Sequence, residues 1–157
     1  MHSAYIKLET IISMVINTLF CAVFAWFPFR GVEAVPLWGA QGLVVDLLPT
    51  TFMITFMTTV AETLLTRKRL GAGRLAAPGV SAPAWLGWLP VHWLLRALAL
   101  GLVMTVLLVP AASLLLMALG IEWLPWANFF AFKLGYGAGL ALVVTPLILQ
   151  AAINDKP

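Results

Sequence analysis

Asp46 and Lys133 are two ionisable residues that lie deep in long apolar stretches of this chain. They follow Trp38 by eight residues and Trp126 by seven. If the tryptophans mark the membrane interface, a rise of about 1.5 Å per residue puts both groups roughly 10–12 Å below it. An ionisable group at that depth usually faces a partner or a water-filled cavity. We therefore expect the two to pair, either as a structural ion pair or as a proton-responsive pair in a polar pathway.

A second polar cluster is expected at the opposite interface, and it consists of Glu9, Glu62, His92 and Arg96. Long side chains at such a level can extend to water. One interpretation is anchoring, with a salt bridge from Arg96 to Glu9 or Glu62. The other is a head-group site of a lipid-handling enzyme.

Two stripes of small polar residues recur at helical spacing. They are Ser13 and Asn17, which continue from Glu9, and Thr51, Thr55 and Thr58, which lead to Glu62. The stripes are expected to form a polar seam, either wet or serving only as hydrogen bonds between helices. The threonine stripe and Asp46 lie on roughly opposite faces of an ideal helix, so a cavity shared by both requires a kink at Pro49.

Small residues also recur every four positions, a spacing that lets helices approach closely. One such stripe is Ala127, Ala131, Gly135 and Gly139, and another is Ala97, Gly101 and Thr105. We expect these stripes to pack against each other within a hairpin or to form a subunit contact. Gly137 and Tyr136 fall off the stripe and are expected to give local flexibility or to line a cavity.

Catalytic signatures are absent from the sequence. It has no H-E-x-x-H, no G-x-S-x-G and no phosphate loop, so we expect no enzyme activity. With only His2, His92 and Cys21 as soft ligands, we expect no metal site and no cofactor. The net charge of +3 is too small and dispersed to indicate nucleic-acid binding.

The elements that position these residues are apolar and long. Hydrophobic residues make up 62% of the 157 and charged residues 10%. Four stretches each reach the roughly 20 residues needed to span a bilayer. The sequence predicts an all-α polytopic membrane protein, one four-transmembrane-helix bundle over 1–157, with spans at 6–28, 36–66, 91–119 and 125–152 and a linker at 67–90.

Charge asymmetry predicts the orientation of the bundle. The linker carries Arg67, Lys68, Arg69 and Arg74, whereas the other two loops carry Arg30 alone. The positive-inside rule then places the linker and both termini in the cytoplasm, in a bacterial inner (plasma) membrane. The latter half of the linker, with Trp85 and Trp88, is expected to lie in the interface.

The linker divides the chain into two similar halves, each a helical hairpin, and a duplication would make them a parallel repeat. The second span, from Pro36 to Thr66, is too long for one crossing. Either it is one continuous, tilted or kinked helix, or it breaks near Asp46–Pro49 and leaves a separate interfacial or re-entrant piece.

The second half contains the sequence WLPW, then an aromatic run, Lys133, small residues and Pro146. In these features it resembles one unit of the short two-helix bacterial inner-membrane proteins grouped as a domain of unknown function. The resemblance implies a helical hairpin, in tandem if both halves belong to it, and no activity.

Three functions remain open. The first is a non-catalytic accessory or transport-type subunit that contains the Asp46–Lys133 pair. The second is a small oligomeric channel or transporter that uses this pair in a polar pathway, and the third is an interfacial lipid-handling enzyme. The expected partners are the lipid bilayer and either further copies of the chain or another membrane protein.

Overall fold

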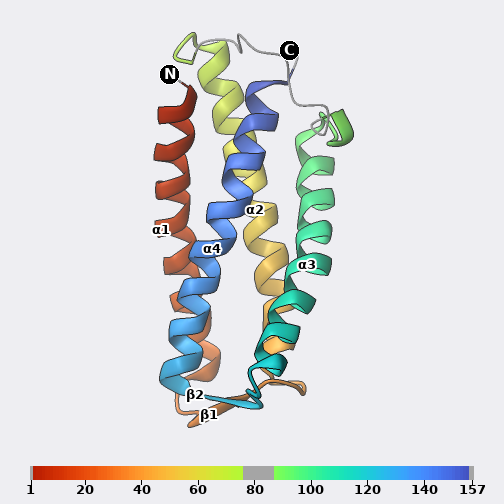
Figure 1. Ribbon diagram of the computed structural model, residues 1–157. Coiled ribbons are helices and arrows are strands. Elements are labelled where there is room, and N and C mark those ends of the chain that lie inside the picture. The colour runs from red at the N-terminus through yellow and green to blue at the C-terminus, as the bar shows by residue number, and fades with distance from the viewer. Residues whose placement is uncertain (1, 76–86, 156–157) are drawn as a thin grey trace.

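The computed structural model describes residues 2–75 and 87–155 and consists mainly of four helices (Figure 1). These are α1 (His2–Phe29), α2 (Leu43–Gly71), α3 (Trp93–Ala118) and α4 (Trp126–Ile153). All four are long and apolar enough to cross a membrane. They run up and down, so both termini lie at one end of the bundle, which we call the linker end (Figure 1). The predicted interfacial placement of Trp85 lies outside the described residues.

The bundle buries many of its polar residues and exposes many of its apolar ones. Glu9, Asn17 and Lys133 are buried, whereas Phe20 of α1 and Val106 of α3 are more than half exposed. A surface of this kind is stable against lipid hydrocarbon and not against water. The protein is therefore an integral membrane protein, and the predicted all-α four-helix bundle is confirmed.

The second helix differs from the prediction at its start. It begins at Leu43, while Pro36 ends a short strand and residues 37–42 form a loop. This loop is closed by its own backbone hydrogen bond, from Gly42 N to Gly39 O at 2.9 Å. From Leu43 the helix continues through Pro49 without a break. The interpretation of one continuous helix was thus correct from Leu43 onwards, whereas residues 36–42 are not part of the helix.

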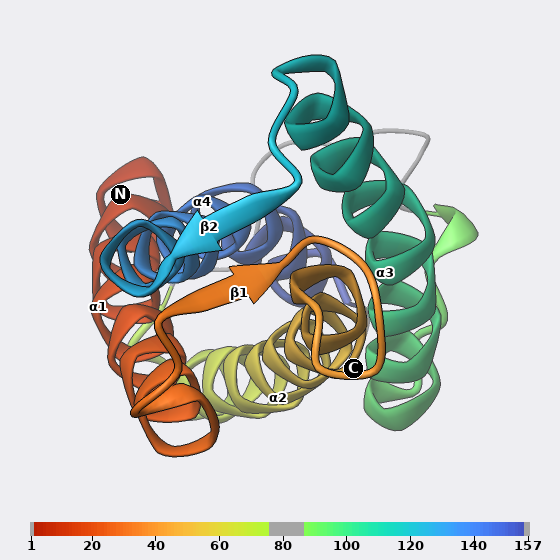
Figure 2. The same cartoon turned by 90° about the horizontal axis from the view of Figure 1, so that it is seen from below.

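Two short strands, which were not predicted, close the end of the bundle opposite the linker; we call it the strand end (Figure 2). Strand β1 (Ala34–Pro36) pairs antiparallel with β2 (Trp123–Pro125), and Val35 lies opposite Leu124. Two further bonds flank the pair symmetrically. Leu37 N donates to Glu122 O at 2.8 Å, and Trp126 N donates to Glu33 O at 3.0 Å.

The strands belong to a sequence repeat. Residues 31–36 read GVEAVP and residues 120–125 read GIEWLP, a separation of 89 residues that also relates the helix ends Phe29 and Ala118. The first glycine of each copy has a positive φ, 85° at Gly31 and 70° at Gly120, which a side chain would disfavour. The two halves therefore share one turn-and-strand design.

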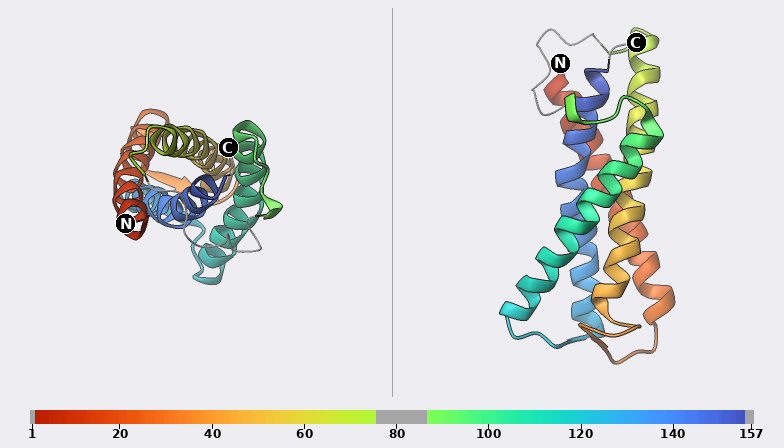
Figure 3. Two further views of the ribbon diagram at one scale, coloured as in Figure 1. Left: turned by 90° about the horizontal axis from the view of Figure 1, so that it is seen from above. Right: turned by 90° about the vertical axis from the view of Figure 1, so that its right-hand side faces the viewer.

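Each helix packs mainly on helices of the other half of the chain. Helix α1 packs mainly on α4, α3 packs on α2, and α2 and α4 pack on each other, whereas α1 and α2 barely touch. Figure 3 shows α3 on the outer side of α2. Each half thus packs its first helix on the second helix of the other half. This arrangement is the one expected for a parallel repeat about an axis along the bundle.

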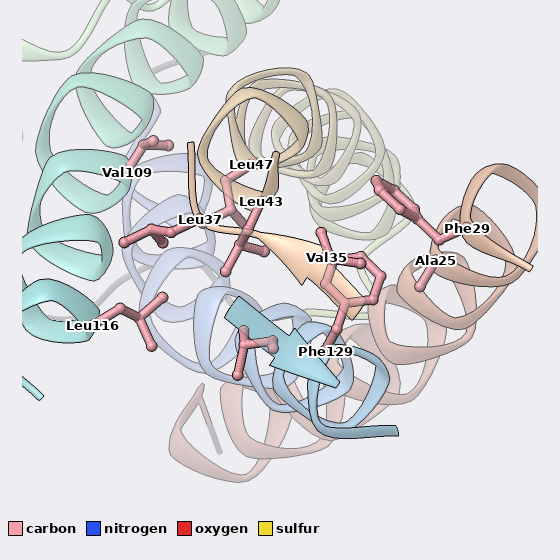
Figure 4. Close-up of a cluster of buried hydrophobic side chains, with 10 residues drawn as sticks. Ala25, Phe29, Val35, Leu37, Leu43, Leu47, Val109, Leu116 and Phe129 are labelled. Atoms are coloured by element: carbon pink, nitrogen blue, oxygen red, sulfur yellow. The ribbon is translucent and has the colours of Figure 1, made fainter. Parts of the chain in front are cut away.

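One of two buried apolar clusters lies towards the strand end (Figure 4), and the other, with Ile54, Leu100 and Ile148, lies further towards the linker end. In the cluster at the strand end, Val35, Leu43 and Phe129 are fully buried, together with residues of α1 and α3. Phe29 and Phe129 pack with their ring centroids 4.6 Å apart. This cluster fixes the start of α2 and of α4, and with it the positions of Asp46 and Lys133.

Candidate functional site

Polar side chains form a column along the buried face of α2 and continue onto α1 and α4. We call this column the polar seam; its members are Glu9, Ser13 and Asn17 of α1, Asp46, Thr50, Thr51, Thr55, Thr58, Thr59, Glu62, Thr63, Thr66 and Arg69 of α2, and Lys133, Tyr136 and Thr145 of α4. Most of them are buried. The seam runs from the Asp46–Lys133 pair near the strand end to Glu9 and Glu62 near the linker end.

Near the strand end, the structure brings Asp46 and Lys133 together. Lys133 has no exposed side-chain surface, and its Nζ donates to Asp46 Oδ2 at 2.5 Å and to Thr50 Oγ1 at 2.8 Å. Asp46 and Thr50 are one turn apart on α2, so both acceptors face α4. Asp46 also lies in the first turn of α2, where the helix dipole favours a negative charge.

The threonine stripe and Asp46 both reach α4 although α2 is continuous at Pro49. Tyr136, three residues after Lys133, shares a hydrogen bond of 2.6 Å with Thr51. Lys133 and Tyr136 therefore contact α2 on both sides of its buried face. The structure does not test the prediction that a cavity shared by Asp46 and the threonine stripe requires a kink at Pro49, which stays a prediction.

The middle of the seam links three helices. Asn17 Nδ2 donates to Ser13 Oγ at 3.1 Å and to Thr58 Oγ1 of α2 at 3.2 Å. Thr145 of α4 donates to Ser13 Oγ at 2.8 Å. Asn17 and Thr58 thus connect α1 and α2, which otherwise have little contact.

At the linker end, the seam contains charged groups. Arg69 forms an ion pair with Glu9 and lies over the ring of Tyr5, 5.2 Å from its centroid. The Tyr5 hydroxyl shares a hydrogen bond of 2.9 Å with Thr66. Glu62 lies beside this group and interacts electrostatically with Glu9 and Arg69.

The predicted cluster of Glu9, Glu62, His92 and Arg96 is divided in the structure. Arg96 is paired with Asp155 at 2.5 Å, so the expected salt bridge to Glu9 or Glu62 was wrong. Asp155 follows the end of α4, which packs beside α2 and thereby brings this carboxylate to Arg96 and also to Arg67, at 2.7 Å. His92 instead stacks on Trp93.

The small-residue stripe of α4 does not pack within its hairpin, whereas the alternative prediction of a subunit contact stays a prediction. Ala131, Gly135 and Gly139 face outwards, and a Cβ added at either glycine would meet nothing within 4 Å. Gly137 makes the close contact instead, because a Cβ there would lie 2.5 Å from Cys21 Sγ. The packing of α1 on α4 therefore depends on the glycine that the four-residue spacing left out.

Gly101 of α3 faces Phe52 of α2, and an added Cβ would lie 2.9 Å from its ring. Its expected role in close packing is present, but the partner is α2 and not the other helix of its hairpin. Thr105, from the same stripe, bonds only to Gly101 O of its own helix, at 2.7 Å.

Several seam residues were missed at the sequence level. They are Thr50, Thr59, Thr63, Thr66, Arg69 and Thr145, and Tyr5, which contacts Thr66 and Arg69 beside the seam, was missed as well. Thr59, Thr63 and Thr66 extend the threonine stripe by one helical turn at a time, so the periodicity contained their signal. Arg69 and Tyr5 gave none, because their roles depend on which helix lies beside which.

Three buried oxygens of the seam have no hydrogen-bond partner among the described residues: Thr55 Oγ1, Glu62 Oε2 and Thr63 Oγ1. All three belong to α2. Buried polar atoms are rarely left unpaired, and a water molecule or an ion is the usual partner where protein atoms supply none. These three oxygens are therefore the atoms of the seam at which a water molecule or an ion would find an acceptor.

Within residues 2–75 and 87–155, no group of three or more His, Cys, Asp or Glu side chains could hold a metal ion. Comparison of the chain with models of known protein families, with curated proteins and with solved structures found no match.

Proposed function

We propose that the protein is a small transport-type membrane protein and that the polar seam is the path of a small polar solute or ion. The observation that carries the proposal is the set of unpartnered oxygens on Thr55, Glu62 and Thr63. In a dry interior, each would cost about 1–3 kcal/mol. Water or a permeating ion removes this cost.

The extent of the seam supports the same function. Its buried groups span α2 from Asp46 in the first turn to Thr66 near the linker end. At 1.5 Å per residue, 20 residues cover about 30 Å, which is the thickness of the hydrocarbon core. Hydrogen bonds needed only for packing would not have to continue over the full depth.

An accessory role is the second candidate, and the Asp46–Lys133 pair favours it. Lys133 is fully buried and is satisfied by two acceptors, an arrangement suited to holding α2 and α4 in register. In that case the outward glycines Gly135 and Gly139 would accommodate a helix of a partner protein or of another copy.

Water access separates the two candidates, and the chain is convenient for measuring it because Cys21 is its only cysteine. In a Cys21→Ala background, single cysteines are introduced at Thr55 and Thr63, with Ser113 of α3 as the matched control. All three positions are at most 3% exposed. The variants in vesicles are treated with a charged, membrane-impermeant methanethiosulfonate reagent.

A transport path predicts that the cysteines at Thr55 and Thr63 react, while the cysteine at Ser113 stays protected. If none of the three cysteines reacts with reagent added on either side of the vesicle membrane, the transport path is contradicted and the accessory role is favoured. Reaction at all three would mean a loosened bundle, and the retained helicity and unfolding temperature of each variant test that explanation.

A further inference from the structure

The linker end of the seam contains more buried negative than positive charge. Glu9 and Glu62 are 3% and 8% exposed, and Arg69 is the cation that contacts them, through its ion pair with Glu9. A buried carboxylate is strongly disfavoured unless a cation or a proton neutralises it. Since Arg69 is committed to Glu9, Glu62 has no Lys or Arg partner of its own among the described residues.

Other charged groups near this end are either paired elsewhere or exposed. Arg67 and Arg96 both bond to Asp155. Lys7 and Lys68 are exposed. On α4, the buried positions nearest the linker end are apolar and include Ile148 and Ala152.

The free oxygen of Glu62 adjoins a row of hydroxyl groups. Thr58 lies one helical turn before Glu62, and Thr55 lies two turns before it, so all three occupy one face of α2. Thr58 accepts a hydrogen bond from Asn17, and Thr55 Oγ1 has no partner among the described residues. Hydroxyl groups with intervening water can conduct a proton along such a row.

From this geometry we infer that Glu62 is the proton-exchanging group of the seam, an inference that rests on the seam being a path for small polar species. In the exchange the carboxylate takes up one proton to become a neutral carboxylic acid and releases it again. No bond other than O–H forms or breaks. The proton enters from the linker end, beside Glu9 and Arg69.

Infrared difference spectroscopy during a pH titration tests the inference without requiring transport. A neutral carboxylic acid has a C=O stretch that the carboxylate lacks. The purified protein in lipid should show such a band that rises as the pH falls, and Glu62→Gln should remove it. Glu62→Asp, which keeps the carboxyl group, should retain a titrating band at a shifted frequency. Glu33→Gln, on the exposed turn at the strand end, is the control and should leave the band assigned to Glu62 unchanged.

A titrating band that is the same in wild type and Glu62→Gln overturns the inference, and so does the absence of any such band. If Glu62→Gln does not fold, Glu62→Asp decides, because a band that neither shifts nor changes its midpoint belongs to another residue. Neither result affects the transport proposal, which depends on the cysteine reactivities at Thr55 and Thr63.

Flux provides the second measurement. Vesicles that contain a trapped pH-sensitive dye and a potassium diffusion potential should acidify with the wild-type protein. With Glu62→Gln, acidification should fall to the rate of protein-free vesicles while the seam cysteines remain reactive. Undiminished proton flux in Glu62→Gln overturns the assignment to Glu62.

Discussion

The buried positions of α2 and α4 correspond to each other, but most of them carry polar side chains in α2 and apolar side chains in α4. Each of the ten buried residues of α2 has a buried counterpart in α4 at a separation of 86 residues, from Leu43 and Phe129 to Thr66 and Ala152. Seven of the ten are polar in α2, but only Lys133 and Thr145 are polar among their counterparts. The two helices therefore share one pattern of buried positions and differ in the side chains at those positions.

The first helices of the two halves show the same contrast. Helix α1 contributes Glu9, Ser13 and Asn17 to the interior. Helix α3 packs on α2 with Ala97, Leu100 and Gly101, and its buried Ser113 bonds only to its own backbone, at Val109 O. A two-fold bundle therefore has one polar side and one apolar side. This division allows the apolar side to stabilise the fold while the polar side serves a function.

The largest loss of stability is expected at the Asp46–Lys133 pair. This is the ion pair that α4 forms among the described residues. Asp46→Leu leaves a fully buried ammonium with Thr50 as its only acceptor, and should lower the free energy of unfolding by about 3–5 kcal/mol. Lys133→Met should cost less, because the Asp46 side chain is 18% exposed. Unfolding by denaturant in detergent micelles, followed by circular dichroism, measures both.

The double variant Asp46→Leu, Lys133→Met is the control for this pair. It should regain most of the stability lost in Asp46→Leu, since no unpaired charge remains. If the losses of unfolding free energy in the two single variants add up in the double variant, the two residues do not stabilise each other. The polar contact between α2 and α4 then contributes little to the fold.

The apolar side has a charged contact at Asp155, and it is expected to show the second-largest effect. Asp155→Ala removes the carboxylate that accepts hydrogen bonds from the buried Arg96 and from Arg67. Hydrogen bonds to charged groups are worth about 1.5–3 kcal/mol, so a loss in that range is expected in the same unfolding assay. Asp155→Asn should lose less, because its side-chain oxygen can still accept a hydrogen bond.

Since Arg96 belongs to α3, Asp155→Ala should also increase hydrogen exchange in α3 more than in α1. Equal protection of both helices would contradict the view that α3 depends on this contact.

The sequence predicted the helices well because spans of about 20 apolar residues have few alternatives. It also identified Asp46 and Lys133, since charges in such spans need partners. It did not show how the helices pack. Packing within each hairpin was one expectation for the small-residue stripes. The exchange of α1 and α3 between halves instead gives Gly101 a contact on α2 and Gly137 a contact on α1.

One available signal for that exchange was overlooked. The repeated turn and strand, GVEAVP at 31–36 and GIEWLP at 120–125, marks the two-fold relation directly. A short strand must pair, and the other copy is the natural partner for it. The seam residues Thr59 and Thr63 were detectable from periodicity alone. The pairing of Glu9 with Arg69 was not, because it depends on how α1 lies beside the linker end of α2.

Three glycine-to-alanine substitutions compare how closely the helices pack at Gly137, Gly101 and Gly135. Gly137→Ala forces a carbon against Cys21 Sγ and Asn17 O, and should destabilise by about 1–3 kcal/mol. Gly101→Ala meets only Phe52, whose ring is partly exposed and can move, so its cost should be smaller. Gly135→Ala meets nothing and should be neutral or stabilise by up to about 1 kcal/mol through helix propensity.

Adding Cys21→Ala to Gly137→Ala removes the nearest clashing atom and should restore part of the loss. If Gly135→Ala proves as harmful as Gly137→Ala, the outward face of α4 is covered in solution. A change in oligomeric state measured by light scattering would then accompany the loss of stability.

A small stability effect is expected at Asn17, although it carries one of the polar links between α1 and α2. Asn17→Leu removes the hydrogen bonds to Ser13 and Thr58, and such bonds in membrane proteins are worth about 0.6 kcal/mol on average. The matched change on the apolar side, Thr105→Val, removes a bond to its own backbone and should have almost no effect. Stability alone would therefore hardly distinguish the two sides.

Flux should distinguish them clearly. The substitution Asn17→Leu would place an apolar side chain across the middle of the seam, so proton entry into vesicles should stop in this variant and continue in Thr105→Val. The cysteine introduced at Thr63, on the linker side of Asn17, should stay reactive from the linker end in both variants. If Asn17→Leu leaves the flux intact, the species that moves does not pass between α1 and α2, and the polar face of α2 stabilises the fold in the same way as the apolar face of α4.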